Sequence, residues 1–343
     1  MATSLRCTGR PRWTCRSCIA ASVTRIAETT SGRVMFQPSW YRGPGPFSRT
    51  WGTSRGDPVP ELRRIKAPEG PSAIVAALQS HGAVIVEDLL DHELLDRFNA
   101  ELDPLLEKAA PDHGGAFLNP AIEWFFGQRT RHVTGVSAKS PIFSAEILIH
   151  PLYLSVADAI LGGNCARYQL NLAHVLDRGP GSERQYLHRD EIVWIHVPDP
   201  HPELQLASVI ALVDFTADNG ATVVAPGSHL WPKGRQAVED DLVVAEMNAG
   251  SAVLYLGSTV HGGGANTTAS QWRRGMHLSY VVGWLRTEEN HYLTTPPDIV
   301  RDLPRQAQEV LGYAAHDAIA DLGGYLGSVE LRDPVDLMAE GRL

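Results

Sequence analysis

The segment Gln185-Tyr186-Leu187-His188-Arg189-Asp190 places a histidine and an aspartate two positions apart. Alternate side chains of an extended chain point to the same side, so His188 and Asp190 can face one point. His261 follows a second apolar run, residues 254–260, and can supply a third ligand there. Two imidazoles and one carboxylate on one face leave the remaining positions of an iron(II) ion open, which is the ligand pattern typical of non-haem iron oxygenases.

Three further blocks follow this segment in a fixed order. The first has Asn219-Gly220-Ala221-Thr222 before Pro226-Gly227-Ser228-His229, the second is His261-Gly262-Gly263-Gly264-Ala265-Asn266, and the third is Arg273-Arg274-Gly275. With these four blocks the chain resembles the phytanoyl-CoA dioxygenase (PhyH) family from roughly residue 70 to the C-terminus. Within that family it is most similar to the bacterial and fungal members that oxidise secondary metabolites.

The resemblance implies an Fe(II)- and 2-oxoglutarate-dependent dioxygenase with His188, Asp190 and His261 as metal ligands. Such an enzyme consumes 2-oxoglutarate and dioxygen, releases succinate and CO2, and hydroxylates or otherwise oxidises an unactivated C–H bond of a small organic molecule. No basic cluster suited to a CoA diphosphate stands out in the acidic body of the chain. We therefore expect a neutral or natural-product substrate.

Two other interpretations of the same residues stay open. One is a cupin-like metalloenzyme that works without 2-oxoglutarate, and the other is a non-catalytic jelly-roll binding protein. The arginines beyond His261 argue against the first, because such enzymes need no clamp for a carboxylate. The complete set of ligands argues against the second. Asp190 also argues against the related iron halogenases, which have no carboxylate at that place.

The expected contacts of 2-oxoglutarate come from four positions. A guanidinium can bind a carboxylate through two parallel hydrogen bonds, which suits an arginine to this role. Arg273 and Arg274 are neighbours on a predicted strand, so only one of them can point inward; the resemblance favours Arg273, and Arg274 remains the alternative. Gln185, Thr222 and Arg131 correspond to further family positions that contact 2-oxoglutarate.

The body of the chain predicts a mainly β fold with a helical buttress. Apolar spacing indicates helices over Asp91–Lys108 and Ile142–Leu161, and over Pro304–Leu322 near the C-terminus. After Gly163 come short apolar or alternating runs, which are typical of strands: Ala166–Leu176, Leu204–Phe215, Leu242–Met247, Ser251–Leu256 and Met276–Trp284. We expect a double-stranded β-helix, the cupin-like jelly roll, with its core at about residues 164–290.

The first part of the chain differs from the rest in charge. Residues 1–56 contain nine arginines, no lysine and one acid, Glu28, a net charge of +8 that leaves −17 for the remainder of a chain of net charge −9. We therefore expect residues 1–57 to be a disordered or transit-like leader and residues 58–343 to be one dioxygenase domain. The expected compartment is the cytoplasm or, if the leader is a transit peptide, the mitochondrion.

Composition narrows the partners to small molecules. A net charge of −9 argues against a nucleic-acid partner. No apolar run approaches the roughly 18 residues that a membrane span requires, so we expect no membrane partner. Cys165 is the single cysteine of the body, which excludes a disulfide framework there and fits a reducing compartment. The oligomeric state does not follow from the sequence.

Overall fold

The computed structural model describes residues 61–232, 234–317, 319 and 325–343. The chain divides into two units, Met1–Pro58 and Val59–Leu343, and the second unit is described here. The expected leader, residues 1–57, lies outside the described residues.

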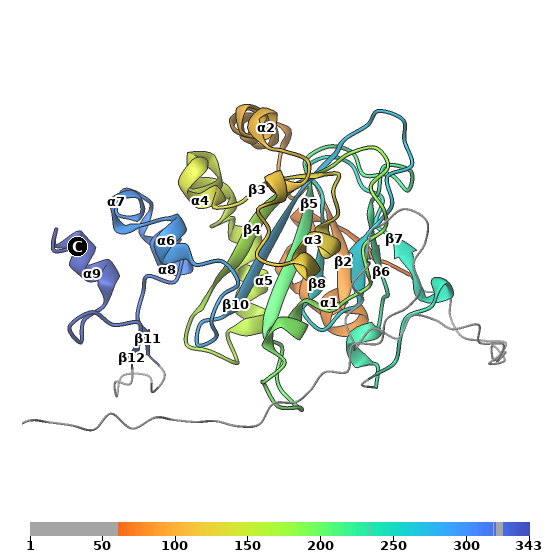
Figure 1. The fold of residues 1–343 in the computed structure, drawn as a ribbon. Coiled ribbons are helices and arrows are strands. Elements are labelled where there is room, and N and C mark those ends of the chain that lie inside the picture. The colour runs from red at the N-terminus through yellow and green to blue at the C-terminus, as the bar shows by residue number, and fades with distance from the viewer. Residues whose placement is uncertain (1–60, 233, 318, 320–324) are drawn as a thin grey trace, which may run out of the picture. The chain divides into compact units, whose positions relative to one another are not determined.

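Two β-sheets form the core of the second unit (Figure 1). The larger sheet has the strand order β1-β2-β8-β5-β10-β4-β3. Its strands are β1 (Arg64–Lys66), β2 (Ala83–Glu87), β3 (Thr130–Val133), β4 (Tyr168–Arg178), β5 (Gln205–Ala211), β8 (Ala252–Leu256) and β10 (Arg273–Val282). The smaller sheet has the order β7-β6-β9, with β6 (Thr222–Val224), β7 (Val243–Val244) and β9 (His261–Gly263). All pairings are antiparallel except that of β1 with β2. The protein therefore has the predicted jelly-roll fold.

The two faces of the larger sheet are covered differently. Its inner face packs against the smaller sheet, since Tyr255 of β8 and Ala207 of β5 share one apolar cluster with Val224 of β6. Its outer face is covered by the helices α1 (Pro71–His81), α2 (His92–Lys108) and α5 (Pro151–Leu161), which contribute to a second and larger cluster. Every residue of β5 is buried, because this central strand is covered on both faces.

The helical predictions hold in part. The backbone N–H of Leu94 donates to Asp91 Oδ1 over 2.8 Å, so Asp91 caps α2 as expected from its position before the apolar repeat. The predicted helix over Ile142–Leu161 is two elements, a π-helix at Phe143–Ile147 and α5, because Pro151 begins a new helix. The prediction of one helix over Pro304–Leu322 was wrong. Among the described residues of this range only α8 (Arg305–Val310) is helical, and Gly312 at φ +85° leads the chain out of it.

The remaining elements are short. Helices and single turns are η1 (Ala67–Glu69), η2 (His113–Gly115), α3 (Pro120–Phe126), α4 (Val136–Lys139), η4 (Asp190–Trp194), η5 (Ser228–Leu230), η6 (Glu239–Asp241), α6 (His291–Thr294), α7 (Pro297–Val300) and α9 (Pro334–Ala339). Strands β11 (His316–Asp317) and β12 (Tyr325–Leu326) form a separate pair. Within the described part of the chain, no helix combines the length and apolar character needed to cross a membrane.

Candidate active site

His188, Asp190 and His261 converge on one point inside the jelly roll. Asp190 Oδ1 lies 3.3 Å from His188 Nε2 and 3.4 Å from His261 Nε2. One ligand atom from each residue lies within 4.8 Å of the other two. The three side chains are largely shielded from solvent, with 13%, 12% and 6% exposed respectively. The spacing of the ligand atoms is therefore that of a group that could share one ion.

Different elements deliver the three side chains. His188 lies just before η4, and Asp190 is the first residue of η4. His261 is the first residue of β9, which follows β8 after a turn that begins beyond Leu256. An isolated β-bridge joins His188 to His261 across the interior. The backbone thus brings two imidazoles together that are far apart in the sequence.

Each histidine has one ring nitrogen engaged by the backbone. His188 Nδ1 lies 2.8 Å from the carbonyl oxygen of Tyr186, and His261 Nδ1 lies 3.1 Å from that of Thr259. A carbonyl oxygen only accepts hydrogen bonds, so Nδ1 must carry the proton in both rings. The unprotonated Nε2 atoms then face Asp190, with their lone pairs available to a metal.

The charge state of these groups also suits a cation. Burial lowers the pKa of His261 to about 4 and so keeps its ring neutral. Burial raises the pKa of Asp190, but the electrostatic influence of the adjacent His261 and His188 outweighs it and holds that pKa well below its usual value. Asp190 Oδ2 is buried and has no hydrogen-bond partner. A buried anionic oxygen that lacks a partner, beside two neutral imidazoles, fits a divalent metal ion.

The two adjacent arginines of β10 point to opposite faces of the larger sheet. Arg273 faces inward and is 2% exposed, with Nε donating to the carbonyl of Gly220 over 3.1 Å and Nη1 buried without a partner. Arg274 faces α2, where its Nη1 donates to Asn99 Oδ1 and Asp103 Oδ1 over 3.0 and 2.8 Å. Arg273 is therefore the arginine that faces the interior.

Arg131 does not lie with this group. It is paired in register with Asp177 of β4, which is paired in turn with Arg274, so all three residues share the outer face of the sheet. Its guanidinium lies 3.7 Å from Asp177 Oδ2 and stacks over Trp272 at 3.9 Å. The expectation that Arg131 contacts 2-oxoglutarate is not met by its position, because an acid and an indole already engage its side chain.

Gln185 and Thr222 meet at Gly263, two residues after the metal ligand His261. Gln185 Oε1 accepts a hydrogen bond from the Gly263 N–H over 2.8 Å, and Thr222 is paired in register with Gly263 across β6 and β9. A Cβ at Gly263 would lie 2.7 Å from Gln185 Oε1, so this glycine is needed for the close approach. Both predicted side chains therefore lie beside the backbone of the metal ligand's own strand.

Three residues near the metal ligands were not predicted from the sequence. The ring of Phe125 from α3 stands edge-on to His188, with 4.8 Å between ring centroids. The fully buried ring of Tyr255 lies 4.1 Å from that of His261. Arg178 lies at the end of β4, and its Cζ would be 3.4 Å from a Cβ added at Gly263. The one sign in the sequence that could have marked Arg178 is its place at the end of a run in which apolar and polar residues alternate.

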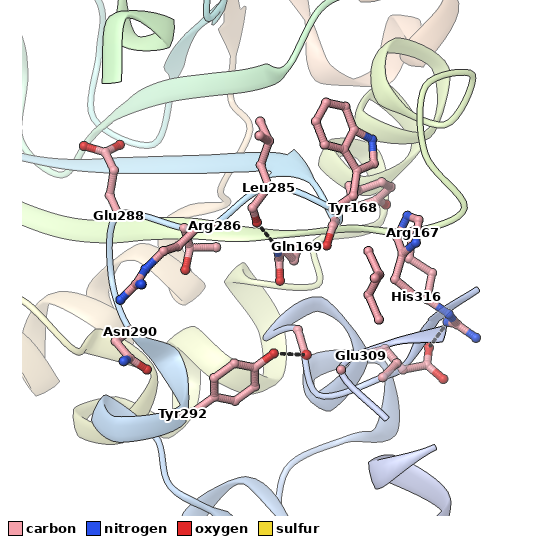
Figure 2. A pocket seen from close by; sticks show the side chains of 17 residues that line it. Arg167, Tyr168, Gln169, Leu285, Arg286, Glu288, Asn290, Tyr292, Glu309 and His316 are labelled. Carbon is pink, nitrogen blue, oxygen red and sulfur yellow. Dashed lines mark hydrogen bonds and ion pairs between the residues drawn. The ribbon is translucent and has the colours of Figure 1, made fainter. Parts of the chain in front are cut away.

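A pocket of about 340 Å³ opens beyond the end of β10. In Figure 2 Glu288 points away from Arg286, Asn290 and Tyr292, which lie on the other side of the chain. Glu288 Oε2 accepts from Asn171 Nδ2 over 2.6 Å, and Asn171 Oδ1 accepts from the backbone N–H of Glu288 over 2.9 Å. Burial raises the pKa of Glu288 to about 7, and the charge of Asp190 contributes to the increase. Glu288, which lines this pocket, is therefore held to Asn171 by two hydrogen bonds.

The chain is similar in sequence to a known protein family and to several fungal dioxygenases. Residues 78–275 match the family described as Phytanoyl-CoA dioxygenase (PhyH). The chain is 34% identical to dioxygenase aneA of Aspergillus aculeatus, over 83% of this chain and 97% of that protein. It is 33% identical to dioxygenase trt7 of Aspergillus terreus, over 74% of this chain and 87% of that protein. Among solved structures, EctD from S. alaskensis in its apo form shares the fold, with a TM-score of 0.50 and 23% identity over 68% of this chain and 85% of EctD.

Proposed function

Because the chain belongs to the phytanoyl-CoA dioxygenase (PhyH) family, and is a 2-oxoglutarate-dependent non-haem iron dioxygenase, we propose that His188, Asp190 and His261 hold its iron. The observation that carries this assignment is the convergence of two free Nε2 atoms on Asp190 Oδ1. Iron, when bound there with 2-oxoglutarate and dioxygen, supplies the oxidant for a C–H bond.

The chain's own residues prepare the site for that ion. The carbonyls of Tyr186 and Thr259 fix the ring orientation and tautomer of His188 and His261. Asp190 contributes a negative charge in a buried place, where the charge stabilises a cation strongly. Three ligands on one side leave the opposite side of the ion to 2-oxoglutarate and dioxygen.

Arg273, Gln185 and Thr222 are the proposed contacts of 2-oxoglutarate. The unpartnered Nη1 of Arg273 is a buried cationic donor, and a carboxylate is the group that best satisfies it. Gln185 and Thr222 both adjoin Gly263, two residues after His261. The contacts of Arg274 with Asn99 and Asp103 on the outer face support the choice of Arg273 over Arg274.

The proposed substrate is a small, largely apolar natural product that is hydroxylated at an unactivated carbon. Aromatic rings from Phe125 and Phe126 of α3 lie against His188 and His132. Burial lowers the pKa of His132 to about 4, so this wall of the site is apolar and uncharged at neutral pH. The Asn171–Glu288 pair offers a hydrogen-bonding group at the other side. The similarity to fungal dioxygenases supports this substrate class.

The compartment is proposed from composition alone. The basic composition of residues 1–57 suits either a cytoplasmic enzyme or a mitochondrial enzyme with a transit peptide. Fluorescent fusions to the full chain and to a chain that begins at Val59 would separate the two locations.

The decisive experiment measures succinate. Purified enzyme is incubated with Fe(II), ascorbate, dioxygen and 2-oxoglutarate, with and without a panel of terpenoid and polyketide compounds. Succinate should form slowly without an organic substrate and faster with an accepted one, while His261→Ala should form none. If the wild-type enzyme forms no succinate under any of these conditions, the proposed use of 2-oxoglutarate is wrong.

A further inference from the structure

Arg178 and Arg273 lie directly opposite each other on neighbouring strands. They are paired in register across β4 and β10, and opposed residues of an antiparallel pair point to the same face. Both side chains face inward, with 3% and 2% of their surface exposed. Two guanidinium groups are thus buried side by side on the inner face of the larger sheet.

Neither guanidinium has an anionic partner. Arg178 Nη2 donates to the carbonyls of Glu183 and Gly264 over 2.5 and 3.4 Å, and Arg273 donates to the carbonyl of Gly220. Arg178 Nε and Arg273 Nη1 are buried without any hydrogen-bond partner. Among the residues that the structure describes, no carboxylate lies within ion-pair distance of either group. Buried charges are ordinarily paired, so the guanidinium groups of Arg178 and Arg273 are suited to bind an anion.

Asp177, the residue before Arg178 on β4, does not face the two guanidinium groups. Asp177 precedes Arg178 on β4 and therefore points to the outer face, where it is paired in register with Arg131 and Arg274. Burial, together with a smaller contribution from the charge of Arg178, lowers the pKa of Arg273 to about 9. Both arginines still carry a proton at neutral pH, so two like charges repel each other unless an anion lies between them.

We infer that Arg178 is a second cationic contact for the distal carboxylate of 2-oxoglutarate, which it shares with Arg273. A Cβ added at Gly263 would lie 3.4 Å from Arg178 Cζ and 2.7 Å from Gln185 Oε1. Arg178 and Gln185 therefore both adjoin Gly263, two residues after the metal ligand His261. The pair should select a 2-oxo acid with a second carboxylate over one without it. This inference rests on the proposed function, because it assumes that 2-oxoglutarate binds at Arg273.

Calorimetric titration of two ligands tests the inference without turnover. 2-Oxoglutarate and 2-oxopentanoate share the 2-oxo acid end and the chain length, but 2-oxopentanoate has a methyl group in place of the distal carboxylate. Each is titrated into the full-length enzyme loaded with Mn(II). Arg178→Gln should weaken 2-oxoglutarate binding by roughly 10- to 100-fold, the value of a charge-assisted hydrogen bond, and leave 2-oxopentanoate binding unchanged. Arg178→Lys, which keeps the charge, should lose less.

A control variant separates this role from a structural one. Arg129 Nη1 also ties the loop after β4, donating to the carbonyl of Pro180 over 3.0 Å, but its side chain is on the surface. Arg129→Gln should leave both affinities unchanged. If Arg178→Gln weakens both ligands equally, or neither, Arg178 only holds the loop and the inference is wrong. Arg273→Gln tests the proposed function separately: if it and the wild-type enzyme do not distinguish the two ligands, Arg273 is not the clamp. Should Arg178→Gln not fold, the ratio of the two affinities in Arg178→Lys decides, because an unchanged ratio contradicts the inference.

Discussion

His188 and His261 exchange two backbone hydrogen bonds. The N–H of His188 donates to the carbonyl of His261 over 3.0 Å, and the N–H of His261 donates to that of His188 over 2.9 Å. Each Nδ1 also contacts the carbonyl two residues before its own ring. The positions of both imidazoles are therefore set by the backbone.

The convergence of His188, Asp190 and His261 predicts metal-dependent stabilisation that needs all three ligands. Mn(II) at about 100 times its dissociation constant should raise the free energy of unfolding by about 2.7 kcal/mol. Asp190→Ala or His261→Ala should abolish that increase and leave a folded protein, because backbone contacts hold the surroundings. Urea unfolding with and without Mn(II) measures the difference. A variant that keeps the full increase would show that the metal binds elsewhere.

The glycines after His261 give a matched pair of variants. A Cβ at Gly263 would lie 2.7 Å from Gln185 Oε1, whereas a Cβ at Gly262 meets nothing nearer than 3.3 Å. Gly263→Ala should displace Gln185 from the Gly263 N–H and weaken 2-oxoglutarate binding by roughly 10-fold, the value of about one hydrogen bond. Gly262→Ala should change the affinity much less. Titration of both variants measures this, and equal affinities would mean that Gln185 does not contact 2-oxoglutarate.

The sequence was sufficient for the features that depend on local pattern. Spacing along an extended chain placed His188 and Asp190 on one side, and the apolar repeat after Asp91 located α2 with its cap. The resemblance to the family identified His261 as the third ligand. Its β-bridge to His188 could not be predicted, because the two residues are far apart in the sequence. Features that depend on tertiary packing were missed, and Arg178 is the clearest example, because only strand register shows which face a side chain takes. Register also explains why Arg131 faces outward: it pairs with the outward-facing Asp177, whereas its neighbour Thr130 pairs with the inward-facing Arg178.

Arg274 should matter for stability and not for 2-oxoglutarate. It joins β10 to α2 through Asn99 and Asp103, and 20% of its side chain is exposed against 59% for Asp103. An ion pair this open to solvent contributes about 1 kcal/mol or less. Arg274→Ala should therefore lower the free energy of unfolding by about that amount and leave 2-oxoglutarate affinity unchanged. A large loss of affinity would show that the two arginines exchange roles in solution.

His132 makes the stability of the protein depend on pH. It is 8% exposed, its Nε2 has no hydrogen-bond partner, and the rings of Phe117 and Phe126 stand edge-on to it. Burial, with smaller contributions from His113 and Arg178, lowers its pKa from 6.5 to about 4. Between these two values the unfolded chain takes up a proton that the folded chain does not, so this residue destabilises the fold as the pH falls below 6.5.

His132→Phe should remove that dependence and keep the aromatic packing. As the pH falls from 6.5 to 4, the variant should gain stability relative to wild type by about 1.4 kcal/mol for each pH unit. Above pH 6.5 the difference between the two proteins should be constant, because His132 is then neutral in both folded and unfolded chains. Buried acids with raised pKa, such as Glu288 at about 7, act in the opposite direction but are common to both proteins and cancel in the comparison. Urea unfolding of both at pH 7.5, 6.5, 5.5 and 4.5 measures the difference, and a difference that does not vary with pH would mean that His132 reaches solvent and protonates in the folded state.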